Sequence, residues 1–448
     1  MGATVGRGGR WWRAAASTFA IVAVSVVLLV GADRLLGLLG YPPAVPIQLT
    51  HPPNFKEVRE TAEFRYTFAT NSRGLRYAEI PVEKEPGEFR ILLLGDSFTE
   101  GDGVELDQTF GSVLEHAYQQ RRTEPKVRLI NGGLSGKGPL EYWRLFLHVG
   151  LAYRPDLLLI VVMANDVENM SENFSPEDLS RIYERGEKKG VKRLAHALLP
   201  HAYTILERAR RLAYVRAERE RPVLDRILEE ARRRGIPEDR IAAWEASLLA
   251  EIRRDAGRLN EGRVSRGLLN SDFLVNNLDI ATPVAETKLR AMITALDKII
   301  ELANARGIRS GVIFAPFDYQ YDPRRLELWD PWVATGMKIN KRWPVSDSVL
   351  QIRLAEWVRA RSLPMLDLTP VFRVAVSRVP AHHLNYRLDG HWTAAGHVVA
   401  AQAIGRWLDE TKLIPSTFVG SYDFELAKDA GRWDRKVEVQ PQVHSATF

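Results

Sequence analysis

The sequence predicts an α/β protein: a three-layer α/β/α domain around a five-stranded parallel sheet, with a helical insertion and an N-terminal transmembrane helix. Three observations predict this fold class. Five short apolar runs alternate with longer helix-like stretches, which is the pattern of a parallel sheet covered by helices. The stretch between the third and fourth runs is far too long for one crossover helix. An uncharged apolar run near the N-terminus is long enough to cross a bilayer.

The N-terminal run is Ala14–Ala32, and it follows a basic N-terminus over residues 1–13. Arginines precede the run, and two tryptophans stand where interfacial aromatics occur: Arg7, Arg10, Arg13, Trp11 and Trp12. By the positive-inside rule the N-terminus stays in the cytoplasm, and the rest of the chain is periplasmic or extracellular. A retained signal anchor is favoured by the apolar residues that follow. A signal peptide cleaved near Val30–Ala32 and a buried soluble helix are the alternatives.

The five apolar runs predict the strands of the sheet. They are short, rich in aliphatic and β-branched residues, and do not alternate with polar residues, as expected of strands buried on both faces. In chain order they are Arg90–Gly95, Val127–Asn131, Leu157–Met163, Ser310–Pro316 and Pro364–Leu368.

The other segments are arranged around these strands. We expect an irregular or short-stranded lead-in over 33–88, the α/β domain over 89–170 and 285–413, a helical insertion over 171–284 and a polar tail over 414–448. Pro237 is placed to begin a helix through EDRIAAWEASLLAEIRR, and Thr287–Arg306 is the expected crossover helix into the fourth strand. The insertion is either a lid or acceptor-binding module, or a helical elaboration that packs on itself and on other proteins.

The composition is that of a globular protein. Of 448 residues, 45% are hydrophobic and 26% are charged, so disorder, collagen and a coiled-coil rod are excluded for the whole chain. The chain has no cysteine, which excludes disulfides, cysteine nucleophiles and thiolate metal sites. The net charge of +6 is small for this length, so we expect no nucleic-acid partner.

Polar and glycine-containing clusters follow four of the predicted strands. They are Gly95–Thr99 after the first strand, Asn131–Gly136 after the second, Ala164–Asp166 after the third and Asp389–Trp392 beyond the fifth. Ligands of open parallel sheets bind at the carboxyl ends of the strands, so these clusters should meet at one edge. Together they contain a serine, a histidine, a carboxylate, an amide and backbone donors, which are the groups that acyl transfer by a serine requires.

These motifs resemble those of the SGNH hydrolases, also called GDSL-like hydrolases, over about Arg90–Met170 and Ser310–Leu408. The motif GDSFTEGDGV is similar to the first block of that family. The resemblance implies a flavodoxin-like three-layer fold and a serine esterase or acyl transferase. It also implies a catalytic triad of Ser97, Asp389 and His391, and an oxyanion hole formed by Ser97, Gly136 and Asn165. The spacing Asp-x-His and the sequence DGHW are more similar to the branch of alginate and other polysaccharide O-acetylation proteins.

Each motif also has an interpretation without catalysis. Asp96 or Ser97 could cap a helix, Asn131 and Gly136 could be turn residues, and Asp389 could cap the last helix. The joint occurrence of these motifs, in the order of the family and each after a predicted strand, favours the catalytic interpretation.

The remaining histidines are expected to have structural roles or none. His397 should pack away from the catalytic face, and His382 and His383 should be exposed in the loop before Asp389. No set of residues has the spacing of metal ligands, so we expect no metal and no cofactor. Gly101–Gly103 is not a phosphate loop, because no Gly-Lys-Ser/Thr follows it.

The sequence therefore predicts a membrane-anchored, extracytoplasmic esterase or deacetylase. Its expected substrate is an ester-linked acyl group, which the resemblance and the predicted location place on a carbohydrate. Two alternatives stay open: a polysaccharide O-acetyltransferase that uses the same triad, and a non-catalytic scaffold of the envelope. The expected partners are an acylated carbohydrate or other ester, the membrane through the N-terminal helix, and envelope polysaccharide machinery.

Overall fold

The computed structural model describes residues 8–39, 50–120, 125–170, 221–327, 331–378 and 384–415, with short pieces between 194 and 209. His382, His383, the tail beyond residue 415 and the insertion residues 171–193 lie outside the described residues. The chain divides into two compact units, Met1–Gln48 with Arg181–Arg221 and Leu49–Ser180 with Pro222–Phe448. The domain boundaries derived from the sequence stay predictions.

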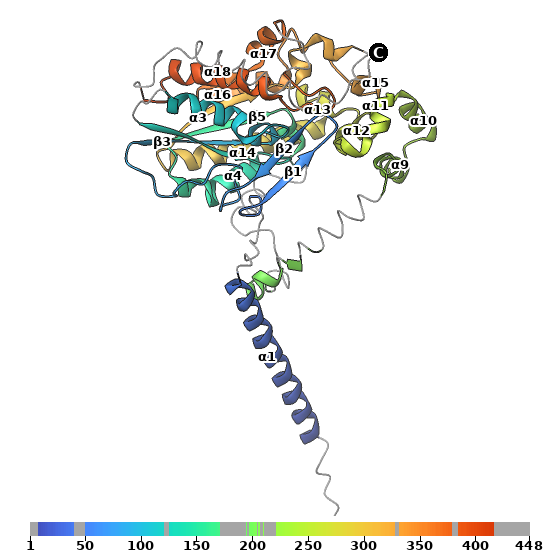
Figure 1. The fold of residues 1–448 in the computed structure, drawn as a ribbon. Coiled ribbons are helices and arrows are strands. Elements are labelled where there is room, and N and C mark those ends of the chain that lie inside the picture. The colour runs from blue at the N-terminus through green and yellow to red at the C-terminus, as the bar shows by residue number, and fades with distance from the viewer. Residues whose placement is uncertain are drawn as a thin grey trace, which may run out of the picture. The chain divides into compact units, whose positions relative to one another are not determined.

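The larger unit is built on a parallel sheet (Figure 1). Within the described residues five strands pair in the order β4-β3-β5-β6-β7, all of them parallel. The strands are β3 (Glu88–Gly95), β4 (Lys126–Gly133), β5 (Leu157–Met163), β6 (Arg309–Ala315) and β7 (Met365–Asp367). This confirms the predicted fold class and each predicted strand. Since the first strand of the sheet, β3, lies inside it, the chain changes direction at β3, and ligands of such sheets bind at that change.

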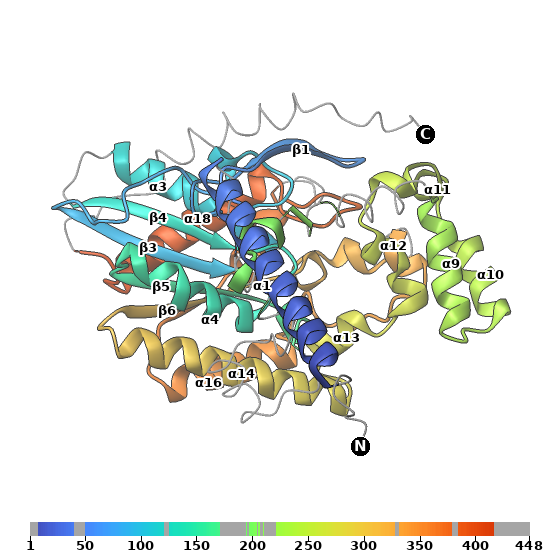
Figure 2. The same cartoon turned by 90° about the horizontal axis from the view of Figure 1, so that it is seen from below.

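Helices cover both faces of the sheet (Figure 2). One face carries α3 (Phe110–Gln120) and α18 (Ala394–Glu410); the other carries α4 (Pro139–His148), α14 (Pro283–Asn304) and α16 (Val349–Ala360). The strands are apolar because they lie between these layers: every residue of β5 is buried. The predicted crossover helix begins four residues early, at Pro283. The Thr282 side chain accepts the Ala285 N–H, and proline suits the first helical position.

Shorter helices follow most strands, and several more belong to the predicted insertion. Near the sheet are α2 (Ser97–Glu100), η1 (Leu106–Gln108), η2 (Gly150–Tyr153), α5 (Asn165–Glu168), η4 (Asp318–Gln320), η5 (Pro323–Leu326), α15 (Pro331–Ala334) and α17 (Thr369–Val376). The insertion contains α9 (Val223–Arg233), α10 (Glu238–Ser247), α11 (Ala250–Asp255), η3 (Ala256–Arg258), α12 (Glu261–Leu269) and α13 (Phe273–Leu278).

The helix predicted to follow Pro237 begins where expected, but it is not continuous. It ends at Ser247 and a new helix begins at Ala250, because Leu248 and Leu249 have extended backbones with ψ of 123° and 149°. The Leu248 side chain at the break is buried, with 5% of it exposed. The prediction of one helix across this point was wrong.

The lead-in contains an antiparallel hairpin of β1 (Lys56–Glu60) and β2 (Arg65–Ala69). Its aromatic side chains form a buried cluster with a residue of the loop before Asp389: Phe64, Tyr66, Phe68 and Tyr386. The Tyr386 hydroxyl donates to the Gly103 carbonyl at 2.9 Å. These contacts attach the hairpin to the edge of the sheet where the polar clusters lie.

The smaller unit contains α1 (Gly8–Leu38). Within it Ala16–Leu38, 23 residues with a mean hydropathy of 2.2, is the one helix of the described residues long and apolar enough to cross a membrane. It extends beyond the predicted run, to Leu38. Asp33 is 1% exposed, and its carboxylate accepts the backbone N–H of Ala202 at 2.7 Å. A charge inside the apolar helix is thus compensated by a hydrogen bond.

Candidate active site

The turn after β3 presents Ser97 at the first position of a short helix. Asp96 caps that helix, since its Oδ1 accepts the Phe98 N–H at 3.0 Å. A Cβ on Gly95 would lie 2.1 Å from the Thr99 hydroxyl oxygen, so the turn is too tight for a larger residue. The capping interpretation of Asp96 is therefore right, and it accompanies a serine side chain held at the edge of the sheet.

His391 and Asp389 lie on a tight turn before α18. Two backbone hydrogen bonds of 2.9 Å close this turn. The Tyr386 N–H donates to the His391 carbonyl, and the Gly390 N–H donates to the Tyr386 carbonyl. Gly390 has a φ of +87°, which glycine adopts without strain, and it lets residues two apart face each other. The cap of α18 is Thr393, whose side chain accepts the Gly396 N–H. Asp389 therefore does not cap α18, which was the non-catalytic interpretation of this residue.

The turn brings the three predicted triad residues together. His391 Nε2 lies 2.8 Å from the Ser97 hydroxyl oxygen, although the two residues are 294 positions apart. On the other side of the ring, His391 Nδ1 is hydrogen-bonded to Asp389 Oδ1, which also accepts the His391 backbone N–H at 3.2 Å. With Nδ1–H donating to the carboxylate, Nε2 is left to accept the serine proton. The short Asp-x-His spacing is thus compatible with direct orientation of the ring.

The electrostatics of the pair follow from its burial and its opposite charges. Burial lowers the pKa of His391, but the charge of Asp389 and its hydrogen bond raise it more, to about 9. Burial raises the pKa of Asp389, but the charge and hydrogen bond of His391 lower it more, below its ordinary value. The pair therefore stabilises an imidazolium, which is the charged form that a serine mechanism creates.

The two other predicted oxyanion donors have different surroundings. Asn165 begins α5 after β5, and its Nδ2 donates to Asp96 Oδ2 at 2.8 Å, which ties it to the serine turn. Gly136 lies exposed in the loop after β4 with a φ of +68°, and Leu134 of this loop donates to the Gly95 carbonyl at 2.9 Å. The described contacts place Asn165 beside the serine turn but include no contact between Gly136 and Ser97. The oxyanion roles stay predictions.

A second network beside the triad was assigned no role from the sequence. Asp102, in the turn after α2, accepts hydrogen bonds from Arg59 Nη1 at 3.2 Å, the Tyr66 hydroxyl at 2.9 Å and the Ser135 hydroxyl at 2.7 Å. Ser135 precedes Gly136, so Asp102 joins the hairpin to the predicted oxyanion loop. The position of Asp102 inside the GDSFTEGDGV motif could have indicated a role for this residue. The residues that donate hydrogen bonds to Asp102 lie more than 30 positions away, so the network itself could not be predicted.

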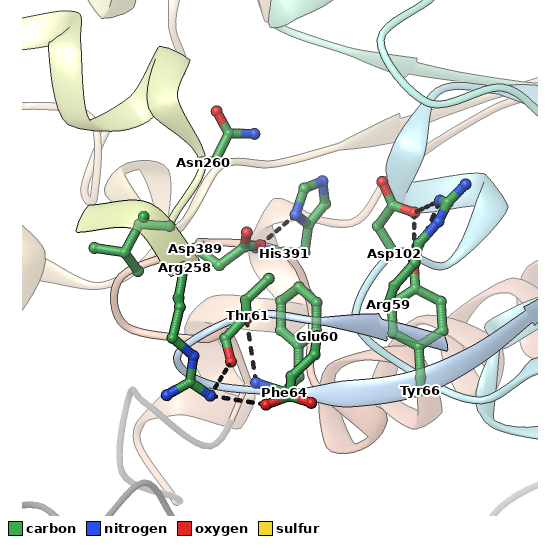
Figure 3. Close-up of a pocket in the computed structure, with 12 residues that line it drawn as sticks. Arg59, Glu60, Thr61, Phe64, Tyr66, Asp102, Arg258, Asn260, Asp389 and His391 are labelled. Carbon is green, nitrogen blue, oxygen red and sulfur yellow. Dashed lines mark hydrogen bonds and ion pairs between the residues drawn. The ribbon is translucent and has the colours of Figure 1, made fainter. Parts of the chain in front are cut away.

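A pocket of about 270 Å³ opens beside the triad (Figure 3). Its walls come from the hairpin, from the Asp102 turn, from residues 257–260 of the insertion and from the triad turn. The lining residues are Arg59, Glu60, Thr61, Phe64, Tyr66, Asp102, Gly257, Arg258, Leu259, Asn260, Asp389 and His391. The hairpin and insertion are bonded to each other here, since Arg258 Nη2 donates to Glu60 and to the Thr61 carbonyl, both at 3.0 Å. Part of the insertion therefore borders the site, as its lid or acceptor interpretation requires.

Two further expectations concern histidines and metals. His397 is 1% exposed, stacks on Phe110 and accepts the Phe110 N–H, and burial lowers its pKa to about 3. It packs, as predicted. Among the described residues no group of three or more His, Cys, Asp or Glu side chains could hold a metal ion.

No protein-family model and no curated protein matches the chain. Solved structures of similar fold include a protein described as a lipolytic protein of the G-D-S-L family from Desulfitobacterium hafniense DCB-2, with a TM-score of 0.33, 11% identity, and coverage of 71% of this chain and 99% of that chain. Another is an acetylxylan esterase from Geobacillus stearothermophilus, with a TM-score of 0.35, 13% identity, and coverage of 71% and 94%. At such identities and TM-scores the assignment of an activity depends on the geometry of the site itself.

Proposed function

We propose that this chain is an SGNH-type serine hydrolase that cleaves ester bonds. The observation that carries the proposal is the continuous hydrogen-bonded series from the Ser97 hydroxyl through both nitrogens of His391 to Asp389. A helix cap alone does not need a histidine from the far end of the chain 2.8 Å from the serine oxygen. Nucleophile, base and orienting acid are together the recognisable unit of this chemistry.

The reaction follows from the roles of the three side chains. Ser97 Oγ forms a bond to the ester carbonyl carbon while His391 Nε2 takes the hydroxyl proton, and Asp389 stabilises the resulting imidazolium. The oxyanion is bound by the Ser97 and Gly136 backbone N–H groups and by the Asn165 amide. The bond to the alkoxy group then breaks, and His391 protonates the departing alcohol. A water molecule, deprotonated by His391, releases the acyl group and regenerates Ser97.

An acylated carbohydrate is the substrate that we propose, outside the cytoplasm and at a membrane. Two features support this part of the proposal. The pocket beside His391 combines hydrogen-bonding side chains with the ring of Phe64, which suits a polyhydroxylated ring. The apolar helix α1 has the length and hydropathy of a membrane anchor.

The same site suits transfer of the acyl group to a sugar hydroxyl. The pocket lies against His391, so an alcohol bound there would stand where the base can deprotonate it. An O-acetyltransferase and an esterase then differ in whether that alcohol or water attacks the acyl-enzyme. The remaining alternative is that the chain is a non-catalytic envelope scaffold. In that case Ser97 would be unreactive.

The test is covalent labelling of Ser97 in the full-length chain in detergent micelles. The protein is incubated with a fluorophosphonate and, separately, with p-nitrophenyl acetate, and its intact mass is measured. We expect a single adduct that is absent in Ser97→Ala and retained in the control Ser377→Ala, which removes an exposed hydroxyl elsewhere. Released acetate or an acetylated sugar, when xylooligosaccharide is added, separates hydrolysis from transfer. A folded wild-type protein without an adduct refutes the proposal.

A further inference from the structure

The hairpin contributes a partly buried carboxyl group to the triad turn. Two hydrogen bonds close the tip between β1 and β2. The Thr61 N–H donates to the Phe64 carbonyl at 2.9 Å, and the Glu63 N–H donates to the Thr61 hydroxyl at 3.2 Å. This geometry directs Glu63 towards the turn before α18. Burial raises the pKa of Glu63, although backbone hydrogen bonds from Leu388 and Asp389 oppose that rise.

The Glu63 carboxylate binds the backbone N–H groups directly before the catalytic pair. Leu388 N lies 2.9 Å from both Glu63 oxygens, and Asp389 N lies 2.6 Å from Glu63 Oε2. These bonds join residues more than 320 positions apart. Two consecutive backbone N–H groups donate to this one carboxyl group, so the contact can fix the turn.

The carbonyl side of the same backbone is held from the insertion and from α15. Arg263 of α12 donates through Nη1 to the Asp389 carbonyl at 2.7 Å, and Trp332 Nε1 donates to the Leu388 carbonyl at 3.1 Å. The opposite charge of Arg263 also lowers the pKa of Glu63, against its burial. The Leu388–Asp389 backbone therefore lies between the Glu63 carboxyl group of the lead-in and the Arg263 guanidinium of the insertion.

This placement has a consequence for catalysis. A rotation of the backbone at Asp389 would move its carboxylate, which is the group that orients His391. Misplacement by about 1 Å can cost on the order of a hundredfold in rate. We propose that Glu63 is a positioning residue: it holds the Asp389 backbone so that the carboxylate keeps His391 in line with Ser97. This inference rests on the proposed function for its link to rate.

The test compares Glu63→Ala and Glu63→Gln with the control Glu83→Gln in the full-length chain in detergent micelles. Glu83 is an exposed residue of the same lead-in, away from the pocket. With p-nitrophenyl acetate we expect Glu63→Ala to lower kcat about tenfold with KM nearly unchanged. Glu63→Gln keeps one acceptor oxygen but turns an NH₂ group towards a backbone N–H, so a smaller loss of the same sign is expected. The control Glu83→Gln should have the kcat and KM of the wild-type protein.

A second readout separates positioning from simple destabilisation. The pKa of His391, measured by NMR on histidine-labelled protein and assigned with His391→Gln, should fall from about 9 towards its ordinary value in the Glu63 variants. A folded Glu63 variant with wild-type kcat and an unchanged His391 pKa overturns the inference; if Glu63→Ala does not fold, Glu63→Gln decides. The titration needs no reaction. Absence of a Ser97 adduct in wild type would therefore refute the proposed function and still leave the positioning measurable.

Discussion

The two turns that meet in the site are built in different ways. The Ser97 turn is held mainly by its own neighbours: the Asp96 cap, the close packing of Gly95, and one bond from Asn165. The Asp389–His391 turn is closed by its own backbone bonds and is held in addition by side chains from distant segments, Glu63 at its N–H groups and Arg263 at its carbonyl. The proposed nucleophile is thus placed mainly by a local motif, whereas the turn of the proposed base also depends on tertiary contacts.

The largest expected effect on the histidine turn comes from Asp389→Asn. An amide can hold His391 in the wrong tautomer, with Nε2 protonated and unable to accept the serine proton, so kcat should fall on the order of 10⁴-fold. The His391 pKa should fall at the same time, because the charge that raises it is lost. Steady-state kinetics and an NMR titration measure both. A kcat within tenfold of wild type would remove Asp389 from the triad.

On the serine turn, Asn165→Ala tests the oxyanion role. Removal of one oxyanion donor should lower kcat about 10²–10³-fold and leave KM nearly unchanged. The control is Asn304→Ala, an exposed amide near the end of α14. If Asn165 only ties α5 to Asp96, thermal stability will fall while kcat in the folded protein stays near wild type.

The pH profile tests the electrostatics of the histidine turn. Only neutral His391 accepts a proton, and its pKa is raised to about 9, so kcat/KM should rise with pH and level off above that value. Two pH units below the pKa about one molecule in a hundred has a neutral ring, which predicts a loss of about a hundredfold at pH 7. A flat profile between pH 7 and 9 would contradict the raised pKa.

The smallest expected effect comes from Gly390→Ala. Alanine at a φ of +87° is strained by about 1–2 kcal/mol, and its Cβ would lie 1.8 Å from Arg263 Nη1. Gly307→Ala is the control, because Gly307 has a φ of +67° with nothing within 4 Å of its Cβ. We expect Gly390→Ala to lower Tm more than Gly307→Ala does, and to lower kcat, which Gly307→Ala should leave unchanged. Equal Tm values and an unaffected kcat would show that the turn does not need the Arg263 contact.

The sequence predicts the parts of this molecule that depend on local patterns. The five strands follow from uninterrupted apolar runs such as Leu157–Met163, and the resemblance of the polar motifs to a known family indicates Ser97, Asp389 and His391 as the triad. Glu63 and Arg263 could not be predicted, since each binds a backbone group more than 120 residues away, and backbone groups carry no sequence signal. The break at Leu248 carries no signal in the sequence, because no proline or glycine marks it within EDRIAAWEASLLAEIRR.

The pocket walls have a consequence for how such a chain can change. The proposed reacting groups stand on the turns after β3 and before α18, whereas most of the pocket wall comes from the hairpin and residues 257–260, which bond to each other through Arg258. We expect that exchanging these two segments together would change which ester the proposed hydrolase accepts. The exchange is constrained at several points, because the strands of the hairpin bind Asp102 through Arg59 and Tyr66. If the inference on Glu63 holds, a replacement hairpin would also need a carboxylate at its tip for the backbone of Leu388 and Asp389.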